Sequence, residues 1–342
     1  MRHRLALIGF GNVGVGLASI LVEKRQSLAR EHHFECDVVA ISDAIKGSVV
    51  DPAGIDLDPI LQAGGKLDTH PKVARNIAAI DAIKASDATV VVEATYTDLA
   101  TGEPAASHVR AAFETGKHVV TTNKGPLALH YHELTTLAAS KGLQFRFEGT
   151  VMSGTPLLSL GTRNLSGCDI SEIRGILNGT TNFILTEMEK GNAYPDALKR
   201  AQELGYAEAD PTGDVDGHDT LGKVLILANV FMGGKLRKEE ISRTGITKIT
   251  SEDVAQAAAE GKRWKLIGRL RRQDGRVAGS VAPEALSLSN PLASVMGAMN
   301  AAQFQTDLLG DVTIVGAGAG RKETGFAILA DLLDIHRTVA RS

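Results

Sequence analysis

Three closely spaced glycines form the first motif of the chain that could do chemistry. Residues 9–14 read Gly-Phe-Gly-Asn-Val-Gly, directly after a short apolar run and before a long helical pattern. A strand, a glycine turn and a helix in this order form the context that a dinucleotide-binding fingerprint requires. The first glycine permits the tight turn, the second lets the backbone approach a pyrophosphate, and the third allows the helix to pack on the strand. Free N–H groups and the helix dipole then favour the phosphates. The residues expected to bind a dinucleotide are Gly9, Phe10, Gly11, Asn12, Val13 and Gly14.

The ribose of such a cofactor has two candidate partners after the second expected strand. Asp43 would accept hydrogen bonds from the ribose hydroxyls, which favours NAD. The distance from the fingerprint to Asp43 exceeds the usual ~20 residues, so the first helix must be long. Lys46 lies close by and would instead meet the 2′-phosphate of NADP. The sequence leaves NAD and NADP both open.

A second motif, residues 208–223, places acids and one lysine ahead of an apolar helix. Its sequence is EADPTGDVDGHDTLGK, and Val224–Phe231 continues the helical pattern. Part of the motif has a structural explanation, because acids near a helix N-terminus bind its free N–H groups and favour its dipole. We expect Asp216 to cap the helix in this way.

Capping does not explain Lys223, because a cation near a helix N-terminus opposes the dipole. Lys223 also shares a face with Ile226, Leu227 and Val230 on an apolar helix, so its side chain should point inward. A buried lysine requires a partner or a function, and Asp219, four residues earlier, is the natural partner. A structural ion pair remains one explanation. We favour the other, in which Lys223 and Asp219 act in catalysis or substrate binding.

The elements that would carry these motifs alternate along the first 150 residues. Short β-branched runs, apolar on both faces, are typical of buried parallel strands, and the segments between them have helical periodicity. The expected strands are residues 5–8, 38–41, 89–92, 118–121 and 144–147, and the expected helices are residues 13–29, 104–115 and 127–140. This alternation predicts an α/β fold with a doubly wound, Rossmann-type parallel sheet.

The pattern of expected helices and strands changes at a Gly/Ser/Thr-rich hinge, residues 149–155. Helices and sparser strands follow, as in an α+β domain. Near the end, glycines at 316, 318 and 320 precede a helical pattern over residues 326–335. We expect a dinucleotide-binding domain at 1–150, a second domain at 151–312, and a C-terminal segment, 313–342, that returns to the first domain.

Composition excludes several classes of protein. The chain has 342 residues, a net charge of −3 and a pI of about 6.4, so neither nucleic acid nor an acidic membrane surface is an expected partner. No apolar run approaches the ~18 residues of a membrane helix. The two cysteines have no metal or redox spacing, which fits the cytoplasm. Basic residues cluster at 262–272, and we interpret them as a solvated face.

Five segments together resemble homoserine dehydrogenase: GFGNVG, NKGPLA (123–128), ILNGTTNFIL (176–185), the 208–223 motif and the terminal GAGAG. The resemblance covers nearly the whole chain. It implies a Rossmann-type domain, a second α+β domain for substrate binding and dimerisation, and a homodimer. It also implies interconversion of aspartate β-semialdehyde and homoserine with NAD or NADP, on the route to threonine and methionine. Many members add an ACT domain or an aspartate kinase, for which we expect no room before Ser342, and hence no strong inhibition by threonine.

The resemblance also implies roles for individual residues. Lys223 matches the catalytic lysine and Asp219 the acid beside it. Glu208 and Asp214 match acids that bind the substrate's amino group. The substrate's carboxylate needs donors as well, and the amides of residues 179–181 are our candidates for it, without support from the resemblance. Lys124 matches a lysine near both nicotinamide and substrate. The remaining matches are Thr95 and Gly318 for the cofactor, and Glu148, Val151, Ser153 and Thr155 for a sodium ion bound through main-chain oxygens.

Two other classes of function remain open at this point. One is a Rossmann dehydrogenase for another small amino-acid aldehyde or imine. The other is a nucleotide-sensing homologue without turnover, against which the complete set of acids and lysine argues. A phosphorylating aldehyde dehydrogenase is disfavoured, because it needs a cysteine nucleophile with a histidine base, and neither Cys36 nor Cys168 has a suitable setting.

Overall fold

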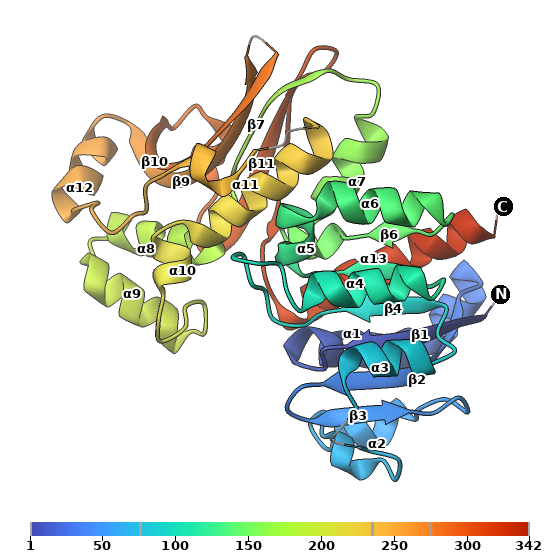
Figure 1. Cartoon of the computed structure of the whole chain (residues 1–342). Coiled ribbons are helices and arrows are strands. Elements are labelled where there is room, and N and C mark those ends of the chain that lie inside the picture. The colour runs from blue at the N-terminus through green and yellow to red at the C-terminus, as the bar shows by residue number, and fades with distance from the viewer. Residues whose placement is uncertain (1, 75–76, 234–235, 274, 341–342) are drawn as a thin grey trace. The chain divides into compact units, whose positions relative to one another are not determined.

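The structure, a computed structural model, describes residues 2–74, 77–233, 236–273 and 275–340. The chain divides into two compact units (Figure 1). The first contains Met1–Gly154 and Gly320–Ser342, and the second contains Thr155–Ala319. Among the described residues, no helix is both long enough and apolar enough to cross a membrane.

The first unit is built on a six-stranded sheet with the order β3-β2-β1-β4-β5-β6. All neighbouring strands are parallel except β3, which pairs antiparallel with β2 at the edge. Its strands are β1 (Arg2–Ile8), β2 (Glu35–Asp43), β3 (Gly47–Val50), β4 (Val90–Glu93), β5 (His118–Thr121) and β6 (Phe145–Arg146). The strand order reverses next to β1, which confirms the doubly wound, Rossmann-type sheet that the sequence predicts.

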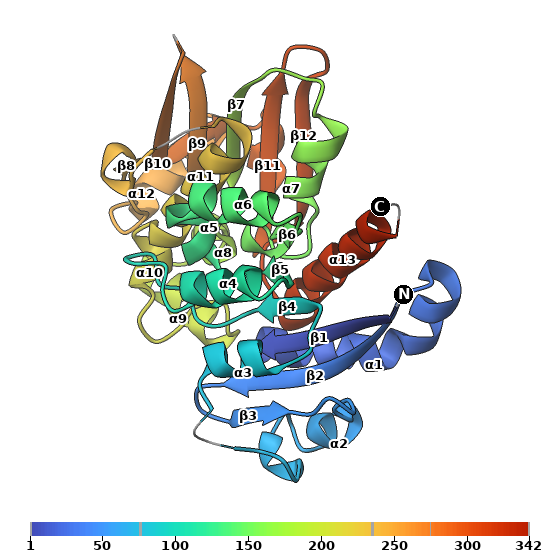
Figure 2. The same cartoon turned by 45° about the vertical axis from the view of Figure 1, so that its right-hand side comes forward.

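Helices cover both faces of this sheet, with α3 and α4 on one face and α1 and α13 on the other (Figures 1 and 2). The helices are α1 (Asn12–His32), α2 (Leu57–Gln62), α3 (Ala79–Ala85), α4 (Ala105–Glu114), α5 (Lys124–Leu129), α6 (Tyr131–Ser140) and α13 (Arg321–Val339), with short 3-10 turns η1 (Leu67–Thr69) and η2 (Glu148–Thr150). Glycines bring α1 and α13 together, because a Cβ at Gly16 would lie 2.3 Å from the carbonyl oxygen of Arg321. The C-terminal helix is thereby packed into the first unit.

Two expectations for the first unit need correction. The single helix expected at 127–140 is two helices, α5 and α6, which meet at His130. The antiparallel edge strand β3 was not expected, because its four residues, Gly47–Val50, are too few to show a pattern.

The second unit is built on another six-stranded sheet, with the order β12-β11-β7-β9-β10-β8. Its pairs are antiparallel except β8 with β10. The strands are β7 (Ile170–Ile176), β8 (Ser242–Arg243), β9 (Lys262–Gln273), β10 (Arg276–Ser287), β11 (Met299–Thr306) and β12 (Gly310–Ala317). The segregated helices and antiparallel pairs make this unit α+β, as expected.

One face of this sheet is covered by α11, which crosses it in Figure 1. A Cβ at Gly268 of β9 would lie 2.9 Å from side-chain atoms of both Thr220 and Val224 of α11, so glycine there lets the helix approach closely. The helices are α7 (Leu157–Ser159), α8 (Gly179–Glu189), α9 (Tyr194–Glu203), α10 (Thr212–Val215), α11 (His218–Phe231) and α12 (Ser251–Ala259), with short turns η3 (Leu160–Asn164), η4 (Lys238–Glu240) and η5 (Pro291–Ser294).

The interpretation of residues 262–272 as a solvated basic face is wrong for Lys265. These residues form β9, in which Arg271 and Arg272 are exposed whereas Lys265 is fully buried. Its ammonium donates to the Val295 carbonyl at 2.7 Å and to Asn182 Oδ1 at 3.0 Å. Burial lowers the pKa of Lys265 to about 8.

The borders between the two units also differ from the expected domain limits. The first unit extends to Gly154 rather than residue 150, and its C-terminal part begins at Gly320 rather than residue 313. The later border follows from β12, which pairs with β11 as far as Ala317. Residues 313–319 therefore belong to the second unit.

Candidate active site

The fingerprint turn follows β1 directly and leads into α1. Gly9 has a φ of +88°, and a Cβ there would lie 2.5 Å from the carbonyl oxygen of Ala94. A Cβ at Gly14 would lie 2.4 Å from the carbonyl oxygen of Gly9, whereas nothing lies within 4 Å of a Cβ at Gly11. The turn is therefore closed on its protein side and open at Gly11, as a cradle for a pyrophosphate requires.

Asp43 and Lys46, the two residues expected to decide between NAD and NADP, are both hydrogen-bonded to this turn. The Asp43 carboxylate accepts from the backbone N–H of Phe10 at 2.9 Å, and of Ile45 and Lys46 at 3.0 Å. Burial alone would raise the pKa of Asp43, but these three N–H groups outweigh it and lower the pKa. The Lys46 ammonium donates to the carbonyl of Phe10 at 2.6 Å. Asp43 and Lys46 thus both bond the backbone of Phe10.

The carboxyl ends of β4 and β5 carry the other expected cofactor residues. Thr95 follows β4, and Lys124 is the first residue of α5, half-buried. Asn123 links the two, because its Nδ2 donates to the carbonyls of Thr95 at 3.2 Å and Tyr96 at 2.7 Å. Its Oδ1 accepts from the N–H of Gly125 at 3.0 Å and so caps α5. Thr95 and Lys124 are therefore brought together at one edge of the first sheet.

The second unit places the Lys223 ammonium against two oxygen atoms. Lys223 is 7% exposed on α11. Its ammonium donates to Asp219 Oδ2 at 2.7 Å, as the i, i+4 spacing predicts, and to the carbonyl of Leu177 at 2.6 Å. The Leu177 carbonyl lies between β7 and α8 and could not be identified from side-chain types.

Asn178 connects the acids of this cluster and was missed in the sequence. Its Nδ2 donates to Asp214 Oδ1 at 2.6 Å and to Asp219 Oδ2 at 3.0 Å. Its Oδ1 caps α8 by accepting from the N–H of Thr181 at 2.9 Å. Burial raises the pKa of Asp214, although the Asn178 amide opposes the shift. An asparagine before Gly-Thr-Thr was a recognisable capping signal, but capping alone would not have revealed the bridge.

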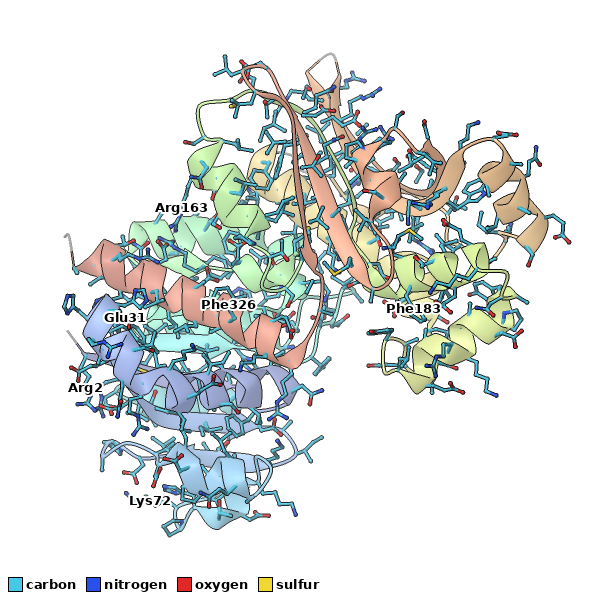
Figure 3. The ribbon with its side chains drawn as sticks, turned by 180° about the vertical axis from the view of Figure 1, so that it is seen from behind. Arg2, Glu31, Lys72, Arg163, Phe183 and Phe326 are labelled. Atoms are coloured by element: carbon cyan, nitrogen blue, oxygen red, sulfur yellow. The ribbon has the colours of Figure 1, made fainter. Side chains whose placement is uncertain are left out.

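Glu208 lies on the exposed segment between α9 and α10. Tyr206, two residues earlier, is tied to α8: its carbonyl accepts from the Thr180 hydroxyl at 2.6 Å, and its ring packs on Phe183 with centroids 5.0 Å apart. Phe183 is labelled in Figure 3. The structure therefore fixes the segment next to Glu208, while the Glu208 side chain itself is exposed.

One other sequence assignment changes. Asp216 does not cap α11, because the N-cap is Gly217, with a φ of +82° and no side-chain bond. Gly318 belongs to the second unit, where a Cβ would lie 2.1 Å from Cγ of Asn300, and its expected contact with the cofactor stays a prediction.

The loop expected to hold sodium has an unusual backbone. Met152 and Ser153 have φ values of +62° and +52°, which non-glycine residues rarely adopt. Glu148 is 5% exposed, and its N–H donates to Asp331 of α13 at 2.8 Å. Burial, and then the nearby Glu148, raises the pKa of Asp331 well above its usual range. Glu148 and Asp331 are thus a pair of buried acids, and Glu148 lies four residues before Met152 in the chain.

Comparisons with known proteins identify the family of the chain. A family model described as the NAD binding domain of homoserine dehydrogenase matches residues 9–148, and one described as homoserine dehydrogenase matches residues 156–333. The NAD(+)-dependent homoserine dehydrogenase of Pseudomonas canavaninivorans is 44% identical over 343 residues, which cover 99% of this chain and 97% of the relative.

Solved structures give the same result. A putative homoserine dehydrogenase from Archaeoglobus fulgidus has a TM-score of 0.88 and 38% identity, covering 97% of this chain and 99% of that one. A hyperthermophilic archaeal homoserine dehydrogenase mutant in complex with NADPH has a TM-score of 0.84 and 32% identity, covering 99% and 98%. With matches over nearly its entire length, the chain belongs to the homoserine dehydrogenase family.

Proposed function

We propose that this homoserine dehydrogenase uses Lys223 as its acid and base in the interconversion of aspartate β-semialdehyde and homoserine. The observation that carries the proposal is the buried Lys223 ammonium, directed by Asp219 and the carbonyl of Leu177. An ammonium has three donors, and two of them are used by these oxygens. The third N–H is left for a substrate oxygen.

The polarity of the reaction matches this arrangement. When bound, the nicotinamide ring of NAD or NADP supplies or accepts the hydride. As the aldehyde is reduced, negative charge develops on its oxygen, which the Lys223 ammonium stabilises and then protonates. Such acid–base assistance typically contributes ~10²–10⁴ in rate, and fixed donors aimed at the oxygen add electrostatic stabilisation. In the reverse direction, the neutral amine accepts the proton of the alcohol.

The substrate is a zwitterion, so it needs acids for its ammonium and donors for its carboxylate. Asp214 and Glu208 serve the ammonium in this proposal, and Asn178 holds Asp214 and Asp219 in place. Among the amides of residues 179–181, that of Thr181 already donates to Asn178 Oδ1. Those of Gly179 and Thr180 therefore serve the carboxylate in this proposal, because a helix N-terminus favours an anion. In the first unit, Thr95 and Lys124 lie at the carboxyl end of the sheet that carries the fingerprint, and we assign Thr95 to the cofactor and Lys124 to both the nicotinamide and the substrate.

An assay of homoserine oxidation at alkaline pH, with NAD and with NADP, tests the proposal. We expect reduced nicotinamide to accumulate only when homoserine is present. Turnover of another small amino-acid aldehyde or imine, without turnover of homoserine, would favour a different dehydrogenase. Coenzyme binding without turnover of any of these would favour a nucleotide sensor.

We also propose that Glu148, Val151 and Ser153 hold a sodium ion through their carbonyl oxygens. The support is the turned backbone at Met152 and Ser153 and the pair of buried acids, Glu148 and Asp331. Thr155, the fourth expected ligand, begins the second unit, and its carbonyl already accepts from the N–H of Leu157 at 2.7 Å. Thermal melts in sodium chloride and in an equal concentration of tetramethylammonium chloride test the site. Equal melting temperatures in both would contradict it.

Finally, we propose a cytoplasmic homodimer that associates through the outer face of the second sheet, the face opposite α11. This face bears a hollow of about 120 Å³ lined by Glu172, Arg174, Arg269, Arg271, Gln303, Gln305 and Asp311. Both signs of charge occur on it, and exposed apolar Val315 lies two residues from Thr313, whose hydroxyl bonds Gln303. A two-fold interface needs such a self-complementary surface.

The proposal of a cytoplasmic location has a separate basis. Both cysteines are free, which suits a reducing compartment.

A further inference from the structure

A buried carboxylate organises the loops at the carboxyl end of β4. Glu93 is fully buried and lies in register with Ile8 of β1 and Thr121 of β5. Its Oε1 accepts from the N–H of Thr95 at 3.2 Å and from the hydroxyl of Thr95. Its Oε2 accepts from the hydroxyl of Thr121 at 3.1 Å, and His108 Nδ1 lies 3.5 Å from Oε1. A buried charge is costly unless several donors satisfy it, and here they converge from three elements.

The carboxylate fixes the direction of the Thr95 hydroxyl. A carboxylate only accepts hydrogen bonds, and a hydroxyl has one proton and two lone pairs. Because Thr95 donates its proton to Glu93, its oxygen can only accept from a ligand. Asn123 Nδ2 lies 3.4 Å from this oxygen but is closer to the carbonyl of Tyr96, at 2.7 Å, so the Thr95 oxygen keeps accepting capacity.

Thr95 also borders the path of the nicotinamide half of a dinucleotide. In the sheet, β1 lies between β2 and β4, and ligands bind at carboxyl ends where the strand order reverses. A pyrophosphate on residues 9–14, with the adenosine ribose toward Asp43 on β2, leaves the β4 side for the other half. The two loops touch, since a Cβ at Gly9 would lie 2.7 Å from the backbone nitrogen of Thr95.

We propose that the Thr95 hydroxyl oxygen accepts a hydrogen bond from the carboxamide –NH₂ of the nicotinamide, with Glu93 as the positioning residue that makes Thr95 an acceptor. The ribose hydroxyls of this half both donate and accept, so they adapt to either polarity. The carboxamide –NH₂ only donates, so it needs a partner that can only accept, as the Thr95 oxygen does. The inference rests on the proposed function, because it presupposes NAD or NADP in this crevice.

The experiment compares the equilibrium binding of NAD with that of its 3-acetylpyridine analogue, by calorimetry and without substrate. The acetyl group keeps the carbonyl of the carboxamide but lacks its N–H donors. Because one net hydrogen bond corresponds to roughly a 3- to 10-fold change in affinity, we expect the wild type to bind NAD tighter by about that factor. Thr95→Val, which has the same shape without the oxygen, should reduce the ratio to about one. If NADP binds tighter than NAD, the same comparison uses NADP and its analogue.

Two matched variants separate this contact from general effects of the substitutions. Thr95→Ser keeps the hydroxyl and should keep the wild-type ratio. Thr89→Val removes a hydroxyl at the opposite end of β4, where it accepts from the N–H of Arg4 at 3.0 Å, and should also keep the ratio. The inference fails if Thr95→Val retains the wild-type ratio, or if the wild type binds both compounds equally. If the wild type binds neither, the proposed function itself fails.

Discussion

Two oxygens of different origin direct the ammonium of Lys223. The Asp219 carboxylate brings the opposite charge, and the carbonyl of Leu177 brings a fixed backbone position. A donor that is already oriented need not reorganise as charge develops on the substrate, which is the basis of electrostatic preorganisation. The same two hydrogen bonds offset the free-energy cost of burying the ammonium. The geometry that stabilises the buried charge is therefore also the geometry that orients it for catalysis.

Removing the Lys223 amine should abolish most turnover and spare coenzyme binding. We expect Lys223→Ala to lower kcat by ~10²–10⁴, the usual worth of acid–base assistance. Coenzyme affinity should be unchanged, because the fingerprint belongs to the other unit. Steady-state kinetics and coenzyme titration check both parts. Lys190→Ala, which removes an exposed lysine paired with Glu187, is the control and should keep full activity. Retention of more than about a tenth of the wild-type kcat in Lys223→Ala would contradict the assignment.

Asp219 should contribute to turnover by positioning Lys223 and not independently of it. Asp219→Asn removes the charge that positions the ammonium and should lower kcat strongly on its own. Residues that act as a unit show strongly non-additive effects, so the Lys223→Ala, Asp219→Asn double variant should be little worse than Lys223→Ala. Multiplying effects in a kinetic double-mutant cycle would mean that the two side chains act independently.

Coenzyme choice should respond to Asp43 more than to the fingerprint glycines. Three backbone N–H groups use most of the accepting capacity of its carboxylate, but a carboxylate has about four acceptor positions. We expect Asp43→Ser to weaken NAD more than NADP, because the ribose hydroxyls lose their acceptor. Lys46→Ala should instead weaken the binding of NADP more than that of NAD. Affinities of both reduced coenzymes, measured by fluorescence titration, give the comparison, and an unchanged preference in Asp43→Ser would move the determinant elsewhere.

At the scale of elements, buried parallel strands were the most predictable part of the fold. Runs such as Val90–Val92 are β-branched and apolar on both faces, which is typical of buried parallel strands. The helix pair α5 and α6 was not predictable, because the break at His130 follows from tertiary packing and involves neither proline nor glycine at the junction. Propensity gives no sign of such a break.

The buried polar residues explain most of what the sequence could not show. Lys223 was recognised because an apolar helix surrounds it, and its partner lies on the same helix. Lys265 was not, because it lies in a basic run and its acceptors come from residues 30 and 83 positions away. Asn178 and Glu93 are likewise defined by partners distant in sequence, for example Asp219 and Thr121. Spacing reveals local pairs, whereas contacts between strands and loops require the fold.

The pairing of β1 with α13 should make the stability of the protein sensitive to acid. His3 Nε2 lies 3.0 Å from His336 Nδ1, and the His3 ring stacks on Phe34. Burial, followed by the nearby His336, lowers the pKa of His3 to about 4. The unfolded chain therefore takes up a proton before the folded chain does. Stability should be unaffected above about pH 6.5 and should fall as the pH drops toward 4, by up to ~1.4 kcal/mol per pH unit for this group.

Urea unfolding of the wild type and of His3→Asn at several pH values checks this prediction. Asparagine keeps a hydrogen-bonding group but does not titrate, so the free energy of unfolding of the variant should depend less steeply on pH between 6.5 and 4. Carboxylates contribute equally to both proteins and cancel in the difference. Identical slopes would show that the His3–His336 contact does not resist protonation.

At the scale of the whole molecule, the outer face of the second sheet carries a network of paired charges. Glu172 is 5% exposed although it lies on this face, because Arg269 and Arg271 cover it with contacts of 2.6 and 2.7 Å. Arg269 also binds Glu284 at 2.7 Å. A network that satisfies its charges within one chain can be buried at an interface with less desolvation cost than isolated charges.

The last prediction follows from this face. If a second copy covers it, Val315→Glu should place an unpaired carboxylate in the interface and shift the protein from dimer to monomer, because an unpaired buried charge is strongly unfavourable. Val315 is 50% exposed within one chain, so the substitution should leave the fold of the protomer intact. Ile45→Glu, at an apolar residue that is 85% exposed on the first unit, is the control and should remain dimeric. Sedimentation velocity over a range of concentrations distinguishes the two states, with circular dichroism to verify folding. A wild type that sediments as a monomer would refute the homodimer, and a dimeric Val315→Glu would move the interface to another face of the molecule.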